Sequence, residues 1–403
     1  MDPDTSDDFK LVTEEPERDP VPPATGERPL YLDHASTTPV LPEVAKVVQH
    51  YMVEEFGNAG SRTHEYGARA LKAVNHAREQ VAEVVDARPD DVIFTSGATE
   101  ANNLAILGLT DFGRESGRKH IISTAIEHKA VLEPLEEMER RGFEVTLIKP
   151  NKGGWVEPAD VLNAVRDDTL LISVMHVNNE TGIIQPLEEI AEGLDGSEVY
   201  FHTDAAQGYG KDLPPLNNQR IDMISISGHK IGAPKGVGSL ILRRRNYKRA
   251  PLKPLMFGGG QERGLRPGTV PVQLVAGLGV AAEIAVARNE IWRSACDHQC
   301  QELRDQLVGL SATPLGDQKR RLPSVINLSF GDRDSEATLL AWRGLLAASN
   351  GAACTSSSYT LSHVLAAMGC TEQEGHCSIR FSWGLTPRDR PLVSLDDSIA
   401  AKD

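Results

Sequence analysis

The chain is poor in cysteine, in basic residues and in long apolar runs, and each shortage excludes a class of protein. Its 403 residues include 5 cysteines, too few for a disulfide framework in a chain of this length. Lysine and arginine total 42 against 57 for aspartate and glutamate, and the net charge of -15 argues against broad contact with nucleic acid or anionic membranes. The most apolar stretch, residues 272–287, contains Glu283 and predicts a buried helix rather than a membrane span. We therefore expect small molecules and other proteins as partners.

The N-terminus lacks the basic start and the apolar core of a signal peptide, so we expect a cytoplasmic protein. Residues 1–28 are rich in aspartate, glutamate and proline, which predicts a disordered acidic tail. An arm over residues 29–43 is expected to pack with a small domain. The predicted large domain covers residues 44–262, and the small domain covers residues 263–403.

Short β-rich runs alternate with helical segments through the large domain. This alternation predicts an α/β fold around a mostly parallel seven-stranded sheet. The smaller α+β domain is expected to contain a single long helix from Val270 to about Gly309 and strands at 325–329 and 378–382. The strand-like runs of the large domain are 92–95, 120–123, 144–148, 170–174, 200–203, 223–226 and 238–242.

Residues 95–102 end a predicted strand in Ser-Gly and open a helix. The N–H groups of Ala98 and Thr99 at such a helix start suit a phosphate, although an ordinary capped turn has the same pattern. Asp204 follows another predicted strand, where it could cap a helix or keep a pyridine nitrogen protonated.

Lys230 comes after a third predicted strand, in the stretch 225–230, where small residues let it approach a ligand closely. An uncharged lysine there could hold a cofactor as a Schiff base. A phosphate turn, an acid and a lysine at the carboxyl edge of one sheet together predict pyridoxal phosphate (PLP) on Lys230.

From residue 31 to about residue 387 the sequence resembles the class I cysteine desulfurases, which are NifS- and IscS-like enzymes of PLP fold type I, and the related selenocysteine lyases. The resemblance implies a PLP-dependent transferase that converts L-cysteine to L-alanine. The matching phrases are 31–35, 96–100, 127–129, 175–182, 204–207, 228–230 and 258–262.

The resemblance also implies roles for individual residues. His128 would stack on the cofactor ring and act in catalysis, Gln207 would bond the phenolic oxygen, and Asn179 would contact cofactor or substrate. The phosphate would be held by Ser227 and His229, and the substrate carboxylate by Arg380. Thr269 would reach the phosphate of a neighbouring subunit, which implies a homodimer.

Cys354 is the implied nucleophile of the family. It would attack the substrate sulfur as a thiolate, carry a persulfide and pass the sulfur to an acceptor protein, while Lys230 moves the α-proton. The run of small polar residues around Cys354 predicts a catalytic-cysteine loop over about residues 349–360.

Three further phrases, 56–67, 231–234 and 349–351, look more like the desulfurase of DNA phosphorothioate modification than like the housekeeping iron–sulfur enzyme. Two alternatives stay open: a selenocysteine lyase, and a non-catalytic sulfur-transfer scaffold that only keeps the fold.

The remaining cysteines form two pairs, Cys296 with Cys300 and Cys370 with Cys377. Neither pair supplies the ligands of a structural zinc site, so we expect no metal. The basic run at 243–249 is interpreted as a solvated turn after a strand rather than as a site for nucleic acid.

Overall fold

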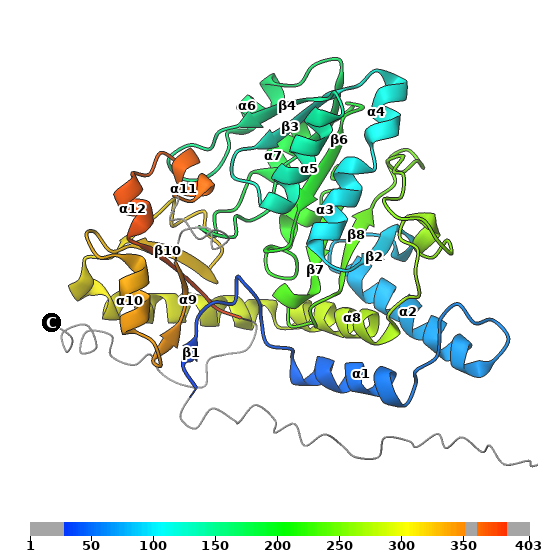
Figure 1. Ribbon diagram of the computed structural model, residues 1–403, viewed down its shortest axis with the longest axis horizontal. Coiled ribbons are helices and arrows are strands. Elements are labelled where there is room, and N and C mark those ends of the chain that lie inside the picture. The colour runs from blue at the N-terminus through cyan, green and yellow to red at the C-terminus, as the bar shows by residue number, and fades with distance from the viewer. Residues whose placement is uncertain (1–27, 351–360, 385–403) are drawn as a thin grey trace, which may run out of the picture.

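The computed structural model describes residues 28–350 and 361–384 (Figure 1). Its main element is a seven-stranded sheet in the order β2-β8-β7-β6-β5-β3-β4. Within this sheet β8 is antiparallel to both of its neighbours, and the other pairings are parallel, which confirms the predicted mostly parallel sheet. The strands are β2 (Val92–Thr95), β3 (His120–Thr124), β4 (Glu144–Ile148), β5 (Thr169–Ser173), β6 (Tyr200–Asp204), β7 (Met223–Ser227) and β8 (Gly238–Leu242).

Apolar clusters cover both faces of this sheet. Successive side chains of a strand point to opposite faces, so neighbouring residues belong to different clusters. Ile93 belongs to one apolar cluster, whereas its neighbours Val92 and Phe94 belong to the other. Helices α3 (Ala98–Leu107) and α5 (Lys129–Arg140) cover the first face. Helices α2 (Glu65–Glu83), α7 (Leu187–Gly193) and α8 (Val272–Ala287) cover the second, and α8 packs against α1 (Pro42–Val53) (Figure 1).

The C-terminal part contains a four-stranded antiparallel sheet in the order β12-β13-β10-β9. The N-terminal arm joins this part of the molecule, because β1 (Leu30–Tyr31) pairs in parallel with β11 (Leu346–Ala347). The strands are β9 (Thr313–Pro314), β10 (Val325–Ser329), β12 (Ser349–Asn350) and β13 (Ser378–Ser382). The remaining α-helices are α4 (Thr110–Ser116), α6 (Pro158–Asn163), α9 (Asn289–Gln306), α10 (Ser335–Ala341), α11 (His363–Ala367) and α12 (Glu372–His376).

The expected single helix from Val270 to about Gly309 is wrong. Helix α8 ends at Ala287 and α9 begins at Asn289, with Arg288 between them at φ -105° and ψ 6°. Tertiary contacts hold the break: the Arg288 guanidinium donates to Glu43 Oε1 at 2.6 Å, and the Asn289 amide donates to the Gly210 carbonyl at 3.0 Å.

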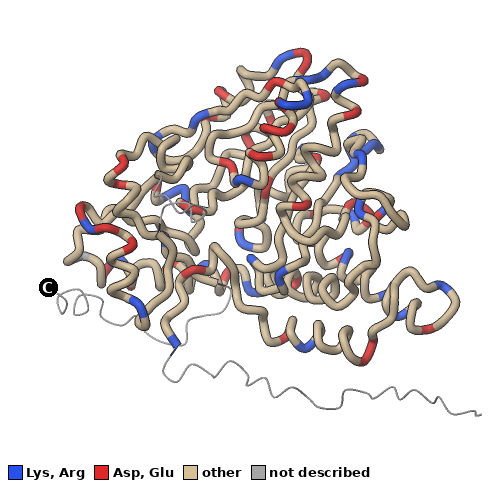
Figure 2. The backbone as a smooth tube through the Cα atoms, in the orientation of Figure 1, with Lys and Arg blue, Asp and Glu red and all other residues tan. Residues whose placement is uncertain are grey.

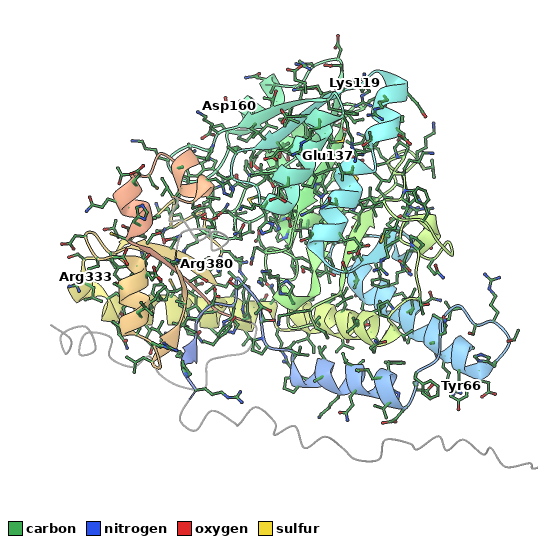
Figure 3. All side chains as sticks on the ribbon, in the orientation of Figure 1. Tyr66, Lys119, Glu137, Asp160, Arg333 and Arg380 are labelled. Atoms are coloured by element: carbon green, nitrogen blue, oxygen red, sulfur yellow. The ribbon has the colours of Figure 1, made fainter. Side chains whose placement is uncertain are left out.

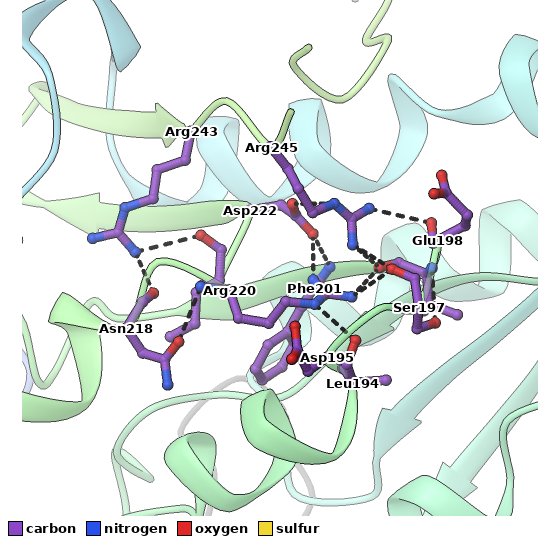
Figure 4. A network of polar contacts seen from close by, with 12 residues as sticks. Leu194, Asp195, Ser197, Glu198, Phe201, Asn218, Arg220, Asp222, Arg243 and Arg245 are labelled. Atoms are coloured by element: carbon purple, nitrogen blue, oxygen red, sulfur yellow. Dashed lines mark hydrogen bonds and ion pairs between the residues drawn. The ribbon is translucent and has the colours of Figure 1, made fainter. Parts of the chain in front are cut away.

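The interpretation of the basic run as solvated is also wrong for Arg243, which is buried. Figure 4 shows that Arg243 and Arg245 turn inward to a network that also contains Asp222. Arg243 donates to the Asn218 carbonyl at 2.8 Å, and Arg245 donates to the Ser197 carbonyl at 2.6 Å. These arginines stabilise the loops that precede β7 and β6.

Acidic and basic residues are interspersed over the described backbone in Figure 2. Among the described residues, no helix is both long enough and apolar enough to cross a membrane. Cys296, Cys300, Cys370 and Cys377 are free thiols. The predicted tail and most of the predicted catalytic-cysteine loop, including Cys354, lie outside the described residues.

Candidate active site

A cavity of about 390 Å³ lies at the carboxyl ends of β2, β6 and β7. The register explains why these ends meet, since Thr95 of β2 and Ser227 of β7 both pair with Gly238 of β8. A Cβ at Gly238 would lie 2.6 Å from Gly97 Cα, so only glycine allows this approach. The predicted site residues that line the cavity are Ala98, Thr99, His128, Asn179, Asp204, Gln207, Ser227, His229, Lys230 and Arg380.

Ala98 and Thr99 form the first turn of α3, where the backbone N–H groups have no partner within the helix. The turn before them is fixed by Glu100, whose carboxylate accepts the Ser96 N–H at 2.7 Å and the Arg266 Nε–H at 3.0 Å. The helix start therefore offers donors and a positive dipole end to an anion.

Lys230 follows β7, and its Nζ donates to the carbonyls of Ala35 at 2.5 Å and Ser36 at 2.7 Å. Burial, together with the positive charges of Lys211 and Arg380, lowers the pKa of Lys230 to about 7. A large fraction of this amine is therefore uncharged at neutral pH, as attack on an aldehyde requires.

Asp204 ends β6 and is almost fully buried, with 6% of its surface exposed. Its Oδ1 accepts the Ala206 N–H at 2.9 Å, and its Oδ2 accepts an N–H of the Asn102 amide at 2.7 Å. Both donors are neutral, so the carboxylate can pair with a cation inside the cavity.

Two histidines lie in the cavity as neutral rings. His128 is the N-cap of α5, where Nδ1 accepts the Ala130 N–H at 3.1 Å, and burial lowers the pKa of His128. Burial, together with the charges of neighbouring lysines, lowers the pKa of His229 to about 4. The positive potential around His229 suits a phosphate.

Arg380 enters the cavity from β13, between the C-terminal elements and the large sheet (Figure 3). Its guanidinium donates to Asp33 Oδ1 at 2.8 Å, to Ser36 Oγ at 2.7 Å and to the Asn179 carbonyl at 2.9 Å. The Nε of Arg380 is buried without a hydrogen-bond partner.

The residues present fit PLP. The cavity volume suits a small cofactor, and the donors needed at its phosphate and the acid needed at its ring nitrogen are both in place. Gln207 also fits: one N–H of its amide bonds the Ala35 carbonyl at 2.8 Å, which leaves the second N–H of the amide to donate to a ligand.

Thr269 does not line this cavity and lies exposed on the surface. Sequence analysis assigned no role to Asn102, Ser36 or Asp33, although each contacts a predicted site residue. A signal existed for Asn102, since it lies one helical turn after Ala98 and shares its face of α3.

Comparisons with known proteins agree with this geometry. Residues 30–387 match the family described as Aminotransferase class-V. The cysteine desulfurase of Homo sapiens is 45% identical over 364 residues, which cover 89% of this chain and 78% of that protein. The crystal structure of DndA from Streptomyces lividans is 53% identical, with a TM-score of 0.78, and covers 88% of this chain and 99% of its own. The structure of SspA in complex with cysteine is 36% identical, with a TM-score of 0.78, over 90% of this chain and 100% of its own.

Proposed function

Since this chain belongs to the cysteine desulfurases of the Aminotransferase class-V family, we propose that it is a PLP enzyme that takes sulfur from L-cysteine and releases L-alanine. The observation that carries the proposal is a single cavity that contains Lys230, Asp204 and Arg380. When bound, the cofactor supplies an electron sink for the bonds at the α-carbon of an amino acid.

The cofactor would be held at several points. Its phosphate would accept from the N–H groups of Ala98 and Thr99 and from the side chains of Ser227 and His229. His128 would lie on its ring, Gln207 would donate to its phenolic oxygen, Asp204 would pair with its ring nitrogen, and Lys230 would attach it covalently.

Lys230 has a second task. Its free amine would take the α-proton of the substrate and return a proton to the product. The pKa of about 7 supports this, because the amine can accept and release a proton near neutral pH. The neutral carbonyls of Ala35 and Ser36 hold it without fixing its charge.

Arg380 and Asn179 would bind the substrate carboxylate. Arg380 is already oriented by Asp33, which accepts from its guanidinium at 2.8 Å. A guanidinium held in this way binds a carboxylate with defined geometry, which directs the substrate thiol away from the phosphate end.

Cys354 would receive the sulfur. Its thiolate attacks the substrate sulfur, the bond between that sulfur and the substrate carbon breaks, and a persulfide remains on the protein. The described residue Ser349, five positions before Cys354, supports this role, because its Oγ accepts from Arg380 at 3.2 Å.

A homodimer would complete the site through Thr269. Two exposed apolar side chains lie on a loop close to that of Thr269. Phe257 is 89% exposed and Met256 is 44% exposed. Their loop contacts the loop of Thr269, because the Gln261 amide oxygen accepts the Gly268 N–H at 2.8 Å. Such a surface suits a second copy of the chain.

The acceptor of the sulfur is a partner protein, and we propose the cytoplasm as the place of transfer. The phrases that resemble the phosphorothioation enzyme favour DNA phosphorothioation as the destination, with iron–sulfur assembly as the alternative. The identity of 53% to DndA, against 45% to the human cysteine desulfurase, supports this preference. A selenocysteine lyase would instead release selenium from selenocysteine and leave the sulfur of cysteine in place.

The decisive test is Cys354→Ala. This variant should keep the cofactor and its visible colour but form no protein persulfide from L-cysteine, as followed by mass spectrometry of the intact chain. Cys370→Ala, which removes a half-buried thiol between α11 and α12, serves as the control and should behave like the parent. Sulfide release by Cys354→Ala at the parent rate would contradict the assigned nucleophile.

A further inference from the structure

Asn102 connects α3 to the acid at the end of β6. Its Nδ2 donates to Asp204 Oδ2 at 2.7 Å, and both side chains line the cavity. The exposed fraction is 0% for Asn102 and 6% for Asp204, so water cannot easily replace this bond. The contact joins residues that are 102 positions apart, and it fixes the acid relative to the phosphate turn at Ala98.

The orientation of the Asn102 amide follows from this contact. With Nδ2 on the carboxylate, Oδ1 is buried without a partner. The reverse orientation would set Oδ1 against a carboxylate oxygen, and two acceptors at this distance repel each other. The amide is thus held by Asp204 alone. Burial of its unpaired oxygen costs folding free energy, which argues against a purely structural role for this asparagine.

The charges around Asp204 come from other elements. Glu127 and His128 lie at the start of α5, Lys230 lies after β7, and all three interact electrostatically with Asp204. None of the ion pairs among the described residues involves Asp204. Its direct partners are the neutral N–H groups of Asn102 and Ala206, so its negative charge remains available to a ligand.

We propose that Asn102 is a positioning residue that holds the Asp204 carboxylate turned toward the ring nitrogen of PLP. The inference rests on the proposed function. An amide suits this role because it donates at every pH, whereas a titratable donor would fail on one side of its pKa.

Asn102→Asp tests the proposal with little change in size. The introduced carboxyl can donate to Asp204 only while the two carboxyls share a proton, and this proton is lost as the pH rises. At low pH the variant should approach the parent. At higher pH, kcat should fall about 10-fold or more, and the Kd for PLP should rise by about 10-fold to 100-fold, because a hydrogen bond to a charged group is replaced by repulsion. The visible spectrum of the bound cofactor should show the same new pH transition.

Asn103→Asp is the matched control. It makes the same change on the next residue of α3, where the Asn103 amide donates to the Thr99 carbonyl at 2.9 Å and does not contact Asp204. Its spectrum and pH profile should follow the parent. Asn102→Leu removes the donor and introduces no titratable group. It should weaken PLP binding at all pH values without a new transition, so the new transition in Asn102→Asp can be assigned to the introduced carboxyl.

A parent-like pH profile and spectrum in Asn102→Asp would overturn the positioning role while leaving the enzyme's function intact. Failure of the parent protein itself to take up PLP or to form alanine would instead overturn the proposed function on which the inference rests.

Discussion

The two walls of the cavity are built from different kinds of structure. The wall proposed for the cofactor comes from the ends of β2, β6 and β7, which are neighbours in one sheet or share β8. The wall proposed for the substrate is joined by the ion pair between Asp33 and Arg380, residues 347 positions apart. The backbone of the first wall is set by strand pairing in the large sheet, although Lys230 and Gln207 also bond carbonyls of the arm, whereas the second wall depends on the arm and the C-terminal sheet meeting over it. Changes in the first wall should therefore affect chemistry, and changes in the second should affect substrate affinity.

Lys230→Ala should have the largest effect. Removal of the amine from the cofactor wall takes away both the covalent attachment and the proposed base, so alanine formation should fall by more than about 1,000-fold. Single-turnover formation of alanine, measured by chromatography, checks this. Lys72→Ala, at an exposed position on α2, should keep parent activity. Normal turnover in Lys230→Ala would contradict the assignment of the chemistry to the cofactor wall.

Arg380→Lys should act on affinity. Lysine keeps the charge but loses the planar fork, so KM for L-cysteine should rise about 10-fold to 100-fold. The Kd for PLP should stay within about twofold, because the cofactor wall is unchanged. Steady-state kinetics and cofactor titration measure the two effects, with Arg333→Lys at an exposed position as the control. A large change in cofactor affinity would show that the walls are not independent.

The pH dependence of cofactor attachment should be moderate. Burial lowers the pKa of Lys230 to about 7, so the reactive uncharged amine is fully present above this pH and is lost as the pH falls through it. The rate at which apoprotein captures PLP should rise roughly tenfold from about pH 6 to about pH 8 and then level off. Stopped-flow absorbance follows the capture. A rate that keeps rising toward pH 10 would mean that Lys230 titrates as an ordinary lysine.

Ser349→Ala should have the smallest effect. Its hydroxyl accepts from Arg380 at 3.2 Å, one of several bonds to this guanidinium. Loss of one neutral acceptor should raise KM for L-cysteine by about threefold, without a change in cofactor binding. An effect as large as that of Arg380→Lys would place Ser349 among the residues that bind substrate.

The cofactor wall could be predicted from the sequence because it depends on local pattern. Apolar runs gave the strands of the large sheet to within one or two residues, and polar residues directly after them marked the sheet edge. The substrate wall could not be found in this way, since the pairing of Asp33 with Arg380 is set by tertiary contact. The break at Arg288 was not predicted for the same reason. Both flanking segments favour helix, and Glu43, which pairs with Arg288, lies far away in the chain.

The most direct measurement locates the cofactor itself. The holoenzyme is reduced with borohydride, which makes the link between PLP and a lysine permanent, and is then digested and analysed by mass spectrometry. The account predicts that the label is found on the peptide that contains Lys230. A label on another lysine, or no label in a protein that forms alanine from cysteine, would contradict it.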